Sequence, residues 1–291
     1  MENTFKVIEN KKKWFALSLT IILIGVVFLF IKGLNFGIDF KGGAIMKVEI
    51  GQTLTNDDIE SIRTISANYD KDATARIVDN TKVEIASSKL SSEELNKIFD
   101  ELKKKYSLGD DVEFSTSRRD ATIGKELTRS AIIASLVAIA LILVYVGIRF
   151  EFKTGISAII ALVHDLLVML TVYAVFQVPV NNSFIAAMLT ILGYSINDTI
   201  VVFDRIRENK KTGKYKDYET LADVSITQTM SRSINTAFTT LITIVAIYIL
   251  GVSAIQEFAF PLIIGIVSGA YSSIFIASPI WVMLEKKNKL A

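Results

Sequence analysis

Ionisable side chains lie within stretches of sequence that are otherwise long and apolar. His164 and Asp165 are adjacent in one such stretch. Asn197 and Asp198 are adjacent in the next, and Arg232 precedes a third. A charged side chain near the bilayer centre costs about 2.5–3.5 kcal/mol on insertion scales, so a residue of this kind indicates a functional site.

Asp198 and Arg232 together have the chemistry of an adjustable proton-binding site. Burial favours the neutral form of a carboxyl group, and a nearby guanidinium favours the ionised form. If the two helices run antiparallel and place these groups side by side, movement of Arg232 would load or release a proton at Asp198. Side chains that could hold water along the path are Asn197, Ser195 and Thr199. The alternative is a static ion pair that fixes helix packing.

His164 is the only histidine in the chain and can titrate near neutral pH. Counted along a helix from Lys153, His164 and Asp165 lie roughly 17 Å deep, near the middle of a bilayer. The alternative is a hydrogen bond from His164 to Asp165 or to a backbone carbonyl that serves packing alone. Asp204 and Arg205 lie at the end of an apolar stretch, where both can reach the interface, so a static ion pair is favoured for them.

The composition excludes several classes of protein. The chain has no cysteine, which excludes disulfides and thiolate metal sites, and its net charge of +2 excludes a strongly basic nucleic-acid binder. The sequence contains no P-loop motif for ATP and no cluster with metal-ligand spacing. We therefore expect no enzyme activity, no cofactor, no metal and no nucleic-acid partner. The chemistry of Asp198 and Arg232 makes protons the expected coupling ion.

Six stretches of the chain are long and apolar enough to cross a bilayer. They predict an all-α bundle of six transmembrane helices, with one polar domain between the first two. The first stretch follows three lysines at 11–13 and lacks a small-x-small cleavage pattern, so we expect an uncleaved anchor. The stretches are Trp14–Ile31, Ser130–Ile148, Thr154–Phe176, Ser183–Phe203, Ile234–Leu250 and Pro261–Leu284.

Lys and Arg side chains are concentrated in both terminal tails, in the turn after the second stretch and in the connection after the fourth. With six spans these segments share one side, and the positive-inside rule places that side and both termini in the cytoplasm. We expect a cytoplasmic N-terminus and first helix over residues 1–34 and an extracytoplasmic domain over 35–125. Helices two to six then occupy 126–291, with a cytoplasmic loop at 204–230.

Residues 35–125 have the pattern of one small α+β domain. Capping boxes begin two helices, at Thr55–Asp58 and at Ser91–Glu94. The resulting order, β-α-β-β-α-β, is ferredoxin-like. The predicted strands are 44–50, 76–78, 82–86 and 112–117, with a hairpin turn at Asp79 and Asn80.

Three segments resemble the SecF family, the smaller membrane subunits of the bacterial SecD–SecF complex that assists protein export. The segments are Phe36–Gly43, Gly193–Asn209 and Ser231–Leu241, and the resemblance extends over nearly the whole chain. The residues that carry the family motifs are Gly37, Asp39, Phe40, Gly42, Gly43, Gly193, Asp204 and Arg205.

This resemblance implies an auxiliary subunit that uses the proton-motive force, within the RND superfamily of transporters. It implies that Asp198 is the family's membrane carboxylate and that Arg232 is the arginine of its Ser-Arg-Ser motif. His164 and Asp165 correspond to a pair in the family's third span. RND transporters need twelve spans in two pseudo-symmetric halves, so six spans imply SecD as the other half. The SecY channel complex, the translocating unfolded protein and the lipid bilayer are the further implied partners, in the bacterial cytoplasmic membrane.

Two other functions are compatible with six spans and a polar domain. One is a half-size RND-like exporter of lipids or small molecules, although a polar-faced domain of about 90 residues offers little room for apolar grooves. The other is a scaffold of the export channel that uses no energy.

Overall fold

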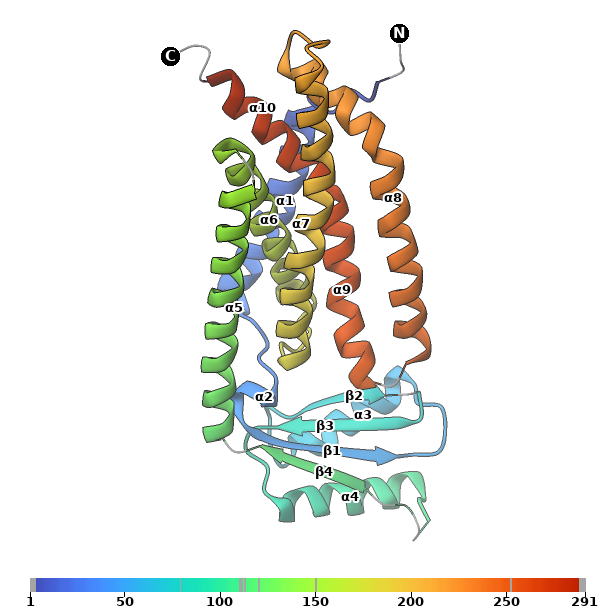
Figure 1. Cartoon of the computed structure of the whole chain (residues 1–291). Coiled ribbons are helices and arrows are strands. Elements are labelled where there is room, and N and C mark those ends of the chain that lie inside the picture. The colour runs from blue at the N-terminus through green and yellow to red at the C-terminus, as the bar shows by residue number, and fades with distance from the viewer. Residues whose placement is uncertain are drawn as a thin grey trace. The chain divides into compact units, whose positions relative to one another are not determined.

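The computed structural model describes residues 4–78, 80–109, 112, 114–119, 121–149, 151–251 and 253–287. The chain divides into two compact units (Figure 1). One unit is helical and comprises Met1–Asn35 with Ala134–Ala291, and the other is Phe36–Ile133. The boundary expected after residue 125 falls inside helix α5 (Ala121–Arg149), because that helix continues without a break from one unit into the other.

Six helices of the described residues are long and apolar enough to cross a membrane, as the sequence predicts. Besides α5, they are α1 (Lys11–Ile31), α6 (Phe152–Phe176), α7 (Asn182–Lys211) and α8 (Tyr218–Leu250). The sixth consists of α9 (Ser253–Ser272), the π-helical segment η1 (Ser273–Ala277) and α10 (Ser278–Lys287).

The segment expected to be a loop, residues 204–230, is mostly helical, which corrects that expectation. Helix α7 continues to Lys211 and α8 begins at Tyr218. Asp217 caps α8, because its carboxylate accepts a hydrogen bond from the Thr220 backbone N–H at 2.8 Å. The charged residues misled the prediction. They occupy the exposed side of amphipathic turns whose apolar side chains, Leu221 and Ile226 among them, are buried in the helical core.

The basic ends of the helices lie together at one end of the bundle. Lys11 of α1 and Lys286 of α10 both pair with Glu219 at the start of α8, at 3.5 and 2.7 Å. Lys153 of α6 pairs with Glu285 of α10 at 2.8 Å. This arrangement agrees with an even number of spans, since the first helix begins where the last one ends.

The π-helical segment η1 interrupts the last membrane helix, and Pro279 accounts for its position. Proline has no N–H to donate, and its ring clashes with the carbonyl four residues earlier, that of Phe275. The backbone responds with a wider turn, and the Ser278 hydroxyl donates to the Ser273 carbonyl at 3.2 Å. Such π turns often occur at functional sites.

The second unit contains the ferredoxin-like arrangement that the sequence predicts. Four antiparallel strands lie in the order β2-β3-β1-β4, and the buried apolar side chains of α3 and α4 share one core with the strands. Both predicted capping boxes are present. Of the predicted hairpin turn, Asn80 has a left-handed φ of 60°, whereas Asp79 lies outside the described residues. The elements are β1 (Gly43–Glu49), α3 (Asn56–Ala67), β2 (Thr74–Val78), β3 (Lys82–Ser87), α4 (Ser92–Tyr106) and β4 (Phe114–Arg119).

A single helical turn, α2 (Ile38–Lys41), precedes strand β1, and two glycines join them. Gly42 and Gly43 have φ values of 74° and 134°, which side chains rarely adopt. A Cβ atom at Gly43 would lie 2.3 Å from the Ser87 carbonyl oxygen. The glycine pair is therefore required by both the backbone conformation and the close approach of β3.

Candidate functional site

Asp165 lies at the centre of the helical unit, and only 1% of it is exposed. Its carboxylate accepts hydrogen bonds from Ser195 of α7 at 2.6 Å, from Ser268 of α9 at 2.6 Å and from Ser272 of α9 at 2.8 Å. We call these three serines with Asp165 the serine cage. Hydrogen bonds to a charged group are stronger than those between neutral groups, so the cage holds α6, α7 and α9 together.

His164 connects the serine cage to α1. Its Nδ1 lies 3.1 Å from Asp165 Oδ1, and its Nε2 lies 3.0 Å from the Ser18 hydroxyl. Ser18 is in turn 3.3 Å from the Tyr271 hydroxyl, which donates to the Trp14 carbonyl at 2.9 Å. The polar groups thus form one continuous chain across the core.

A count of hydrogens along this chain distinguishes two protonation states of His164. With a neutral ring that donates to Asp165, Nε2 must accept the Ser18 hydrogen, and the contact from Ser18 to Tyr271 then lacks a hydrogen. With a protonated ring, Nε2 donates to Ser18, and Ser18 donates to Tyr271. Every hydrogen bond from Asp165 to the Trp14 carbonyl is also complete when Nε2 carries the ring hydrogen and the shared proton lies on the Asp165 carboxyl, which then donates to Nδ1. One added proton on the pair of His164 and Asp165 therefore completes the whole set.

Asp198 is held by a different serine from the same helix. Its Oδ2 accepts a hydrogen bond of 2.6 Å from Ser273, the first residue of η1. Ser272 and Ser273 are consecutive, so two adjacent hydroxyls contact the two membrane carboxylates, Asp165 and Asp198. Asn197 is exposed on the outer side of α7.

The structure does not bring Asp198 and Arg232 together as an ion pair, which corrects the expectation that they lie side by side. Contacts from Tyr194 to Thr240 and from Asn209 to Ser225 fix the antiparallel register of α7 and α8. In that register Arg232 lies opposite Val202, about one helical turn or ~6 Å from the level of Asp198. The Arg232 side chain is exposed, and within the described ranges it makes no ion pair.

The remaining motif residues lie elsewhere in the structure. Asp204 is 3.8 Å from Arg149, and Arg205 is 3.1 Å from Glu208 on the same helix. Gly193 is exposed on α7, and no atom lies within 4 Å of the place where a Cβ would be. The other five belong to the unit that carries the sheet, in and beside α2: Gly37, Asp39, Phe40, Gly42 and Gly43.

Most of the hydroxyl groups that contact the two carboxylates lie in no recognisable sequence motif. Gly265 and Gly269 nearby have the GxxxG spacing that allows close packing of membrane helices. The structure shows its consequence, since a Cβ at Gly265 would lie 2.4 Å from the Ile191 side chain. The spacing of three serines after Gly265 on one membrane helix could have pointed to Ser268, Ser272 and Ser273. No sequence signal pointed to Ser18 or Tyr271.

Two helices expose polar or small residues in places where a membrane helix is normally apolar. On α8 they lie at positions 232, 236, 239 and 243, and on α7 at positions 186, 190, 193 and 197. Helical spacing puts each set on one side of its helix. We call these two stripes together the open polar face. Among the described residues, no group of three or more His, Asp or Glu side chains is placed to hold a metal ion.

Residues 100–287 match the family described as "Protein export membrane protein SecD/SecF, C-terminal", and residues 27–53 match the "SecD/SecF GG Motif". The protein translocase subunit SecF of Dictyoglomus turgidum is 38% identical over 280 residues, which are 95% of this chain and 96% of that protein. The protein translocase subunit SecDF of Bacillus subtilis is 38% identical over 278 residues, which are 94% of this chain but 37% of that protein.

Two solved structures have the same fold. The crystal structure of SecDF from Thermus thermophilus, a translocon-associated membrane protein, matches 99% of this chain with a TM-score of 0.84 and 33% identity. A crystal structure of SecDF in a super-membrane-facing form matches 100% of this chain with a TM-score of 0.72 and 30% identity. This chain spans 39% and 40% of those two longer chains.

Proposed function

This chain belongs to the SecD/SecF family of protein export membrane proteins, and from that premise we propose that it is an auxiliary subunit of the bacterial Sec machinery. In this proposal it acts with SecD and uses the proton-motive force to promote protein translocation across the cytoplasmic membrane. It consumes no ATP, because protons are the coupling ion. The observation that carries the proposal is the pair of membrane carboxylates joined by two adjacent serines.

The chemistry of Asp198 explains how a proton could do mechanical work here. An ionised carboxylate only accepts hydrogen bonds, whereas a protonated one also donates. Protonation of Asp198 therefore weakens its hold on the Ser273 hydroxyl at the start of η1. Because Ser272 is bound to Asp165, that change is transmitted to the serine cage and to the packing of α9 against α6 and α7.

Asp165 and His164 provide a second place for a proton in this scheme. His164 lies between the serine cage and Ser18, and its protonation completes the hydrogen-bond chain toward α1. We propose that the path includes Asp198, Asn197, Asp165 and His164. Arg232 lies one helical turn from the level of Asp198. It would favour the ionised form of Asp198 when a movement of α8, or extension of the Arg232 side chain, brings the guanidinium closer to the carboxylate.

The open polar face supports a second membrane half as partner. Small and hydroxyl-bearing residues are typical of the interfaces between membrane helices. Relatives named SecDF match this chain over about two fifths of their length, which leaves room in them for another half. We propose that SecD covers this face, and that the SecY channel complex and the unfolded substrate are further partners. The positive-inside rule supports cytoplasmic termini and an extracytoplasmic domain at 35–125.

Substitution of Asp198 by Asn tests the proton role. Asparagine keeps the size of the side chain and can accept the Ser273 hydrogen bond, but it cannot bind a proton reversibly. We expect Asp198→Asn to abolish the stimulation of export by the proton-motive force in membrane vesicles, with the protein present at the normal level.

The matched control is Asp204→Asn, which removes a carboxylate from the same helix, closer to its C-terminal end. We expect it to retain most of the stimulation, because Asp204 is partly exposed and pairs with Arg149 rather than with the serines. Normal stimulation in Asp198→Asn would contradict the proton role. Loss of export only in proportion to loss of protein would instead indicate a scaffold that uses no energy.

A further inference from the structure

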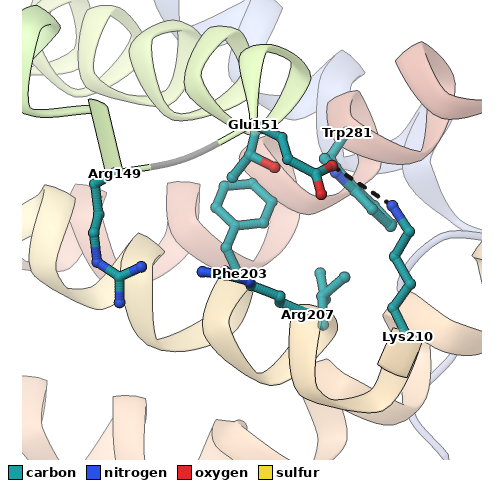
Figure 2. Close-up of a pocket in the computed structure, with 8 residues that line it drawn as sticks. Arg149, Glu151, Phe203, Arg207, Lys210 and Trp281 are labelled. Atoms are coloured by element: carbon teal, nitrogen blue, oxygen red, sulfur yellow. Dashed lines mark ion pairs between the residues drawn. The ribbon is translucent and has the colours of Figure 1, made fainter. Parts of the chain in front are cut away.

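A small cavity of about 100 Å³ lies between the ends of four helices of the helical unit. Figure 2 shows the side chains that surround it, from the end of α5, the start of α6, the last turns of α7, and α10. None of these side chains contacts Asp165 or Asp198. Arg149 pairs with Asp204, further along α7. The cavity is therefore separate from the serine cage and from Asp198.

The lining of this cavity carries more basic than acidic side chains. Arg149, Arg207 and Lys210 line it, against one acidic residue, Glu151. Outside the lining, Asp204 lies 3.8 Å from Arg149, and Glu285 lies 3.9 Å from Lys210. Lys210 lies 3.6 Å from Glu151, a contact drawn in Figure 2. The Arg207 side chain is exposed and makes no ion pair within the part of the chain that the structure describes. Its guanidinium is thus available to an anion.

The first turn of α6 adds to this positive potential. Thr154, in that turn, lines the cavity, and the α6 N-cap residue Glu151 makes no capping hydrogen bond through its side chain. Backbone N–H groups at a helix start carry a partial positive charge and favour an anion. Arg149 and Lys210 already have carboxylate partners, so Arg207 is the cation with most to gain from an anion. Together with this helix start it favours a phosphate group over a neutral ligand.

The rest of the cavity lining and the exposed side of α5 are apolar. Phe203, Ile206 and Trp281 line the cavity with Arg207. On α5, which ends at the cavity with Arg149, large apolar side chains are exposed: Leu136 at 62%, Leu141 at 65%, Val144 at 57% and Ile148 at 84%. A membrane span presents such side chains to acyl chains. The site therefore combines a cationic end with an apolar surface.

The cavity also lies at the level where headgroups are expected. Arg149 ends one apolar span and Glu151 caps the next, so the short connection between them marks the boundary of the hydrocarbon region. Basic pockets between membrane helices at this level bind phosphate-bearing lipid headgroups. We propose that this cavity binds the phosphate of an anionic phospholipid, with Arg207 as its principal ligand and the acyl chains along α5.

Fluorescence quenching of Trp281 tests this site in the full chain, because Trp281 lines the cavity. The chain has two tryptophans, and Trp14→Phe leaves Trp281 as the sole reporter. The protein is placed in phosphatidylcholine nanodiscs that contain a small fraction of phosphatidylglycerol brominated on its acyl chains. We expect brominated phosphatidylglycerol to occupy the site about tenfold more strongly than brominated phosphatidylcholine.

Two variants, each made together with Trp14→Phe, distinguish binding in this cavity from general attraction of anionic lipid to the positive surface. Arg207→Gln removes the proposed ligand, and Lys211→Gln removes an exposed charge from the same end of α7 outside the cavity. We expect Arg207→Gln to abolish the preference for phosphatidylglycerol and Lys211→Gln to retain it. Thermal unfolding confirms that both variants are folded.

Three outcomes would overturn the proposal. The first is equal quenching by the two brominated lipids, and the second is an equal loss of preference in Arg207→Gln and Lys211→Gln. The third is recovery of fluorescence when inorganic phosphate is added to the aqueous phase, because it would assign the site to soluble phosphate. None of these measurements depends on export activity, so the result is independent of the proposed proton role.

Discussion

Serine hydroxyls, rather than fixed cations, provide most of the contacts of the two membrane carboxylates. Asp165 has three such donors and Asp198 has one. When one partner of a buried ion pair is neutralised, the other charge is left buried without a partner, which costs several kcal/mol. A hydroxyl donor can rotate to another acceptor, as Ser273 can toward the Ala270 carbonyl at 3.2 Å. The Ser273 hydroxyl therefore has a second acceptor within reach when Asp198 releases it.

The Ser273 hydroxyl can be tested at the level of the single residue. We expect Ser273→Ala to lower export driven by the proton-motive force about tenfold, because a hydrogen bond to a charged group contributes about 1.5–3 kcal/mol. Ser273→Thr keeps the hydroxyl and should retain most of the activity. The measurement is the rate of export in membrane vesicles, with and without a proton-motive force.

Comparison of the two Ser273 variants identifies what the residue does. If alanine and threonine lowered export equally, the residue would matter only for the packing of η1, and the hydrogen-bond role would be wrong. Thermal stability of the purified variants shows whether either substitution disturbs the fold.

Helix starts and turns explain where the elements of the sheet-bearing unit begin and end. In each capping box an acidic side chain accepts a hydrogen bond from the N-cap backbone: Asp58 from Thr55 and Glu94 from Ser91, both at 2.8 Å. Those backbone N–H groups are the main reason that the pKa values of Asp58 and Glu94 lie below their usual range. The half of each box that the carboxylate accepts is therefore strongest while the carboxyl group is ionised.

The sign of this pH dependence follows from the lowered pKa values. The contribution of Asp58 and Glu94 is fully present above their ordinary pKa values, near pH 4, and is lost as the pH falls through the lowered ones. We expect faster hydrogen exchange in the first turns of α3 and α4 below about pH 4, after correction for intrinsic rates.

At neutral pH, Thr55→Ala should raise amide exchange in the first turn of α3 about fivefold, since loss of an N-cap costs about 1 kcal/mol. Thr64→Ala, at another exposed threonine of the same helix, serves as the control and should have little effect. Equal effects of the two substitutions would show that the cap does not stabilise the helix start.

At the scale of the whole molecule, the open polar face is the feature that a single chain leaves unexplained. Exposed polar side chains on α8 would face hydrocarbon if nothing covered them, and each unsatisfied polar group costs free energy in lipid. The exposed stripe of α7 contains Gly193, where a partner helix can approach closely. A second six-helix half on this face satisfies both requirements.

Gly193→Leu tests whether a partner covers this face. No atom of the chain lies within 4 Å of the added Cβ, so we expect the purified variant to unfold at an unchanged temperature. Copurification of the SecD partner should fall severalfold, because the larger side chain blocks the approach of a helix. The measurement is the amount of partner recovered per amount of tagged chain.

Gly147→Leu is the matched control, since Gly147 is also exposed in open space, on α5. It should leave recovery of the partner unchanged. Equal recovery with Gly193→Leu would contradict the placement of the partner on the open polar face.

Local and periodic features of the sequence predicted the architecture correctly. Span length predicted the six helices, and capping boxes with alternating strands predicted the βαββαβ unit. Both follow from short-range physics, namely the thickness of a bilayer and the needs of a helix end. The cost of an ionisable group in a membrane likewise singled out Asp165 and Asp198 before any contact was known.

Contacts between helices were beyond the reach of such patterns. The segment 204–230, expected to be a loop, is mostly helix because packing buries its apolar side. Arg232 lies one helical turn from the level of Asp198, because contacts elsewhere along α7 and α8 fix the register of the two helices. Hydroxyl groups such as Ser272 and Ser273 are ordinary in sequence. They become ligands of the two carboxylates only where Pro279 widens a turn and Gly265 lets α9 approach α7. Sequence alone thus determined where ionisable groups interrupt the membrane spans, and tertiary packing decided which groups they touch, since hydrogen bonds depend on distances that residue order does not encode.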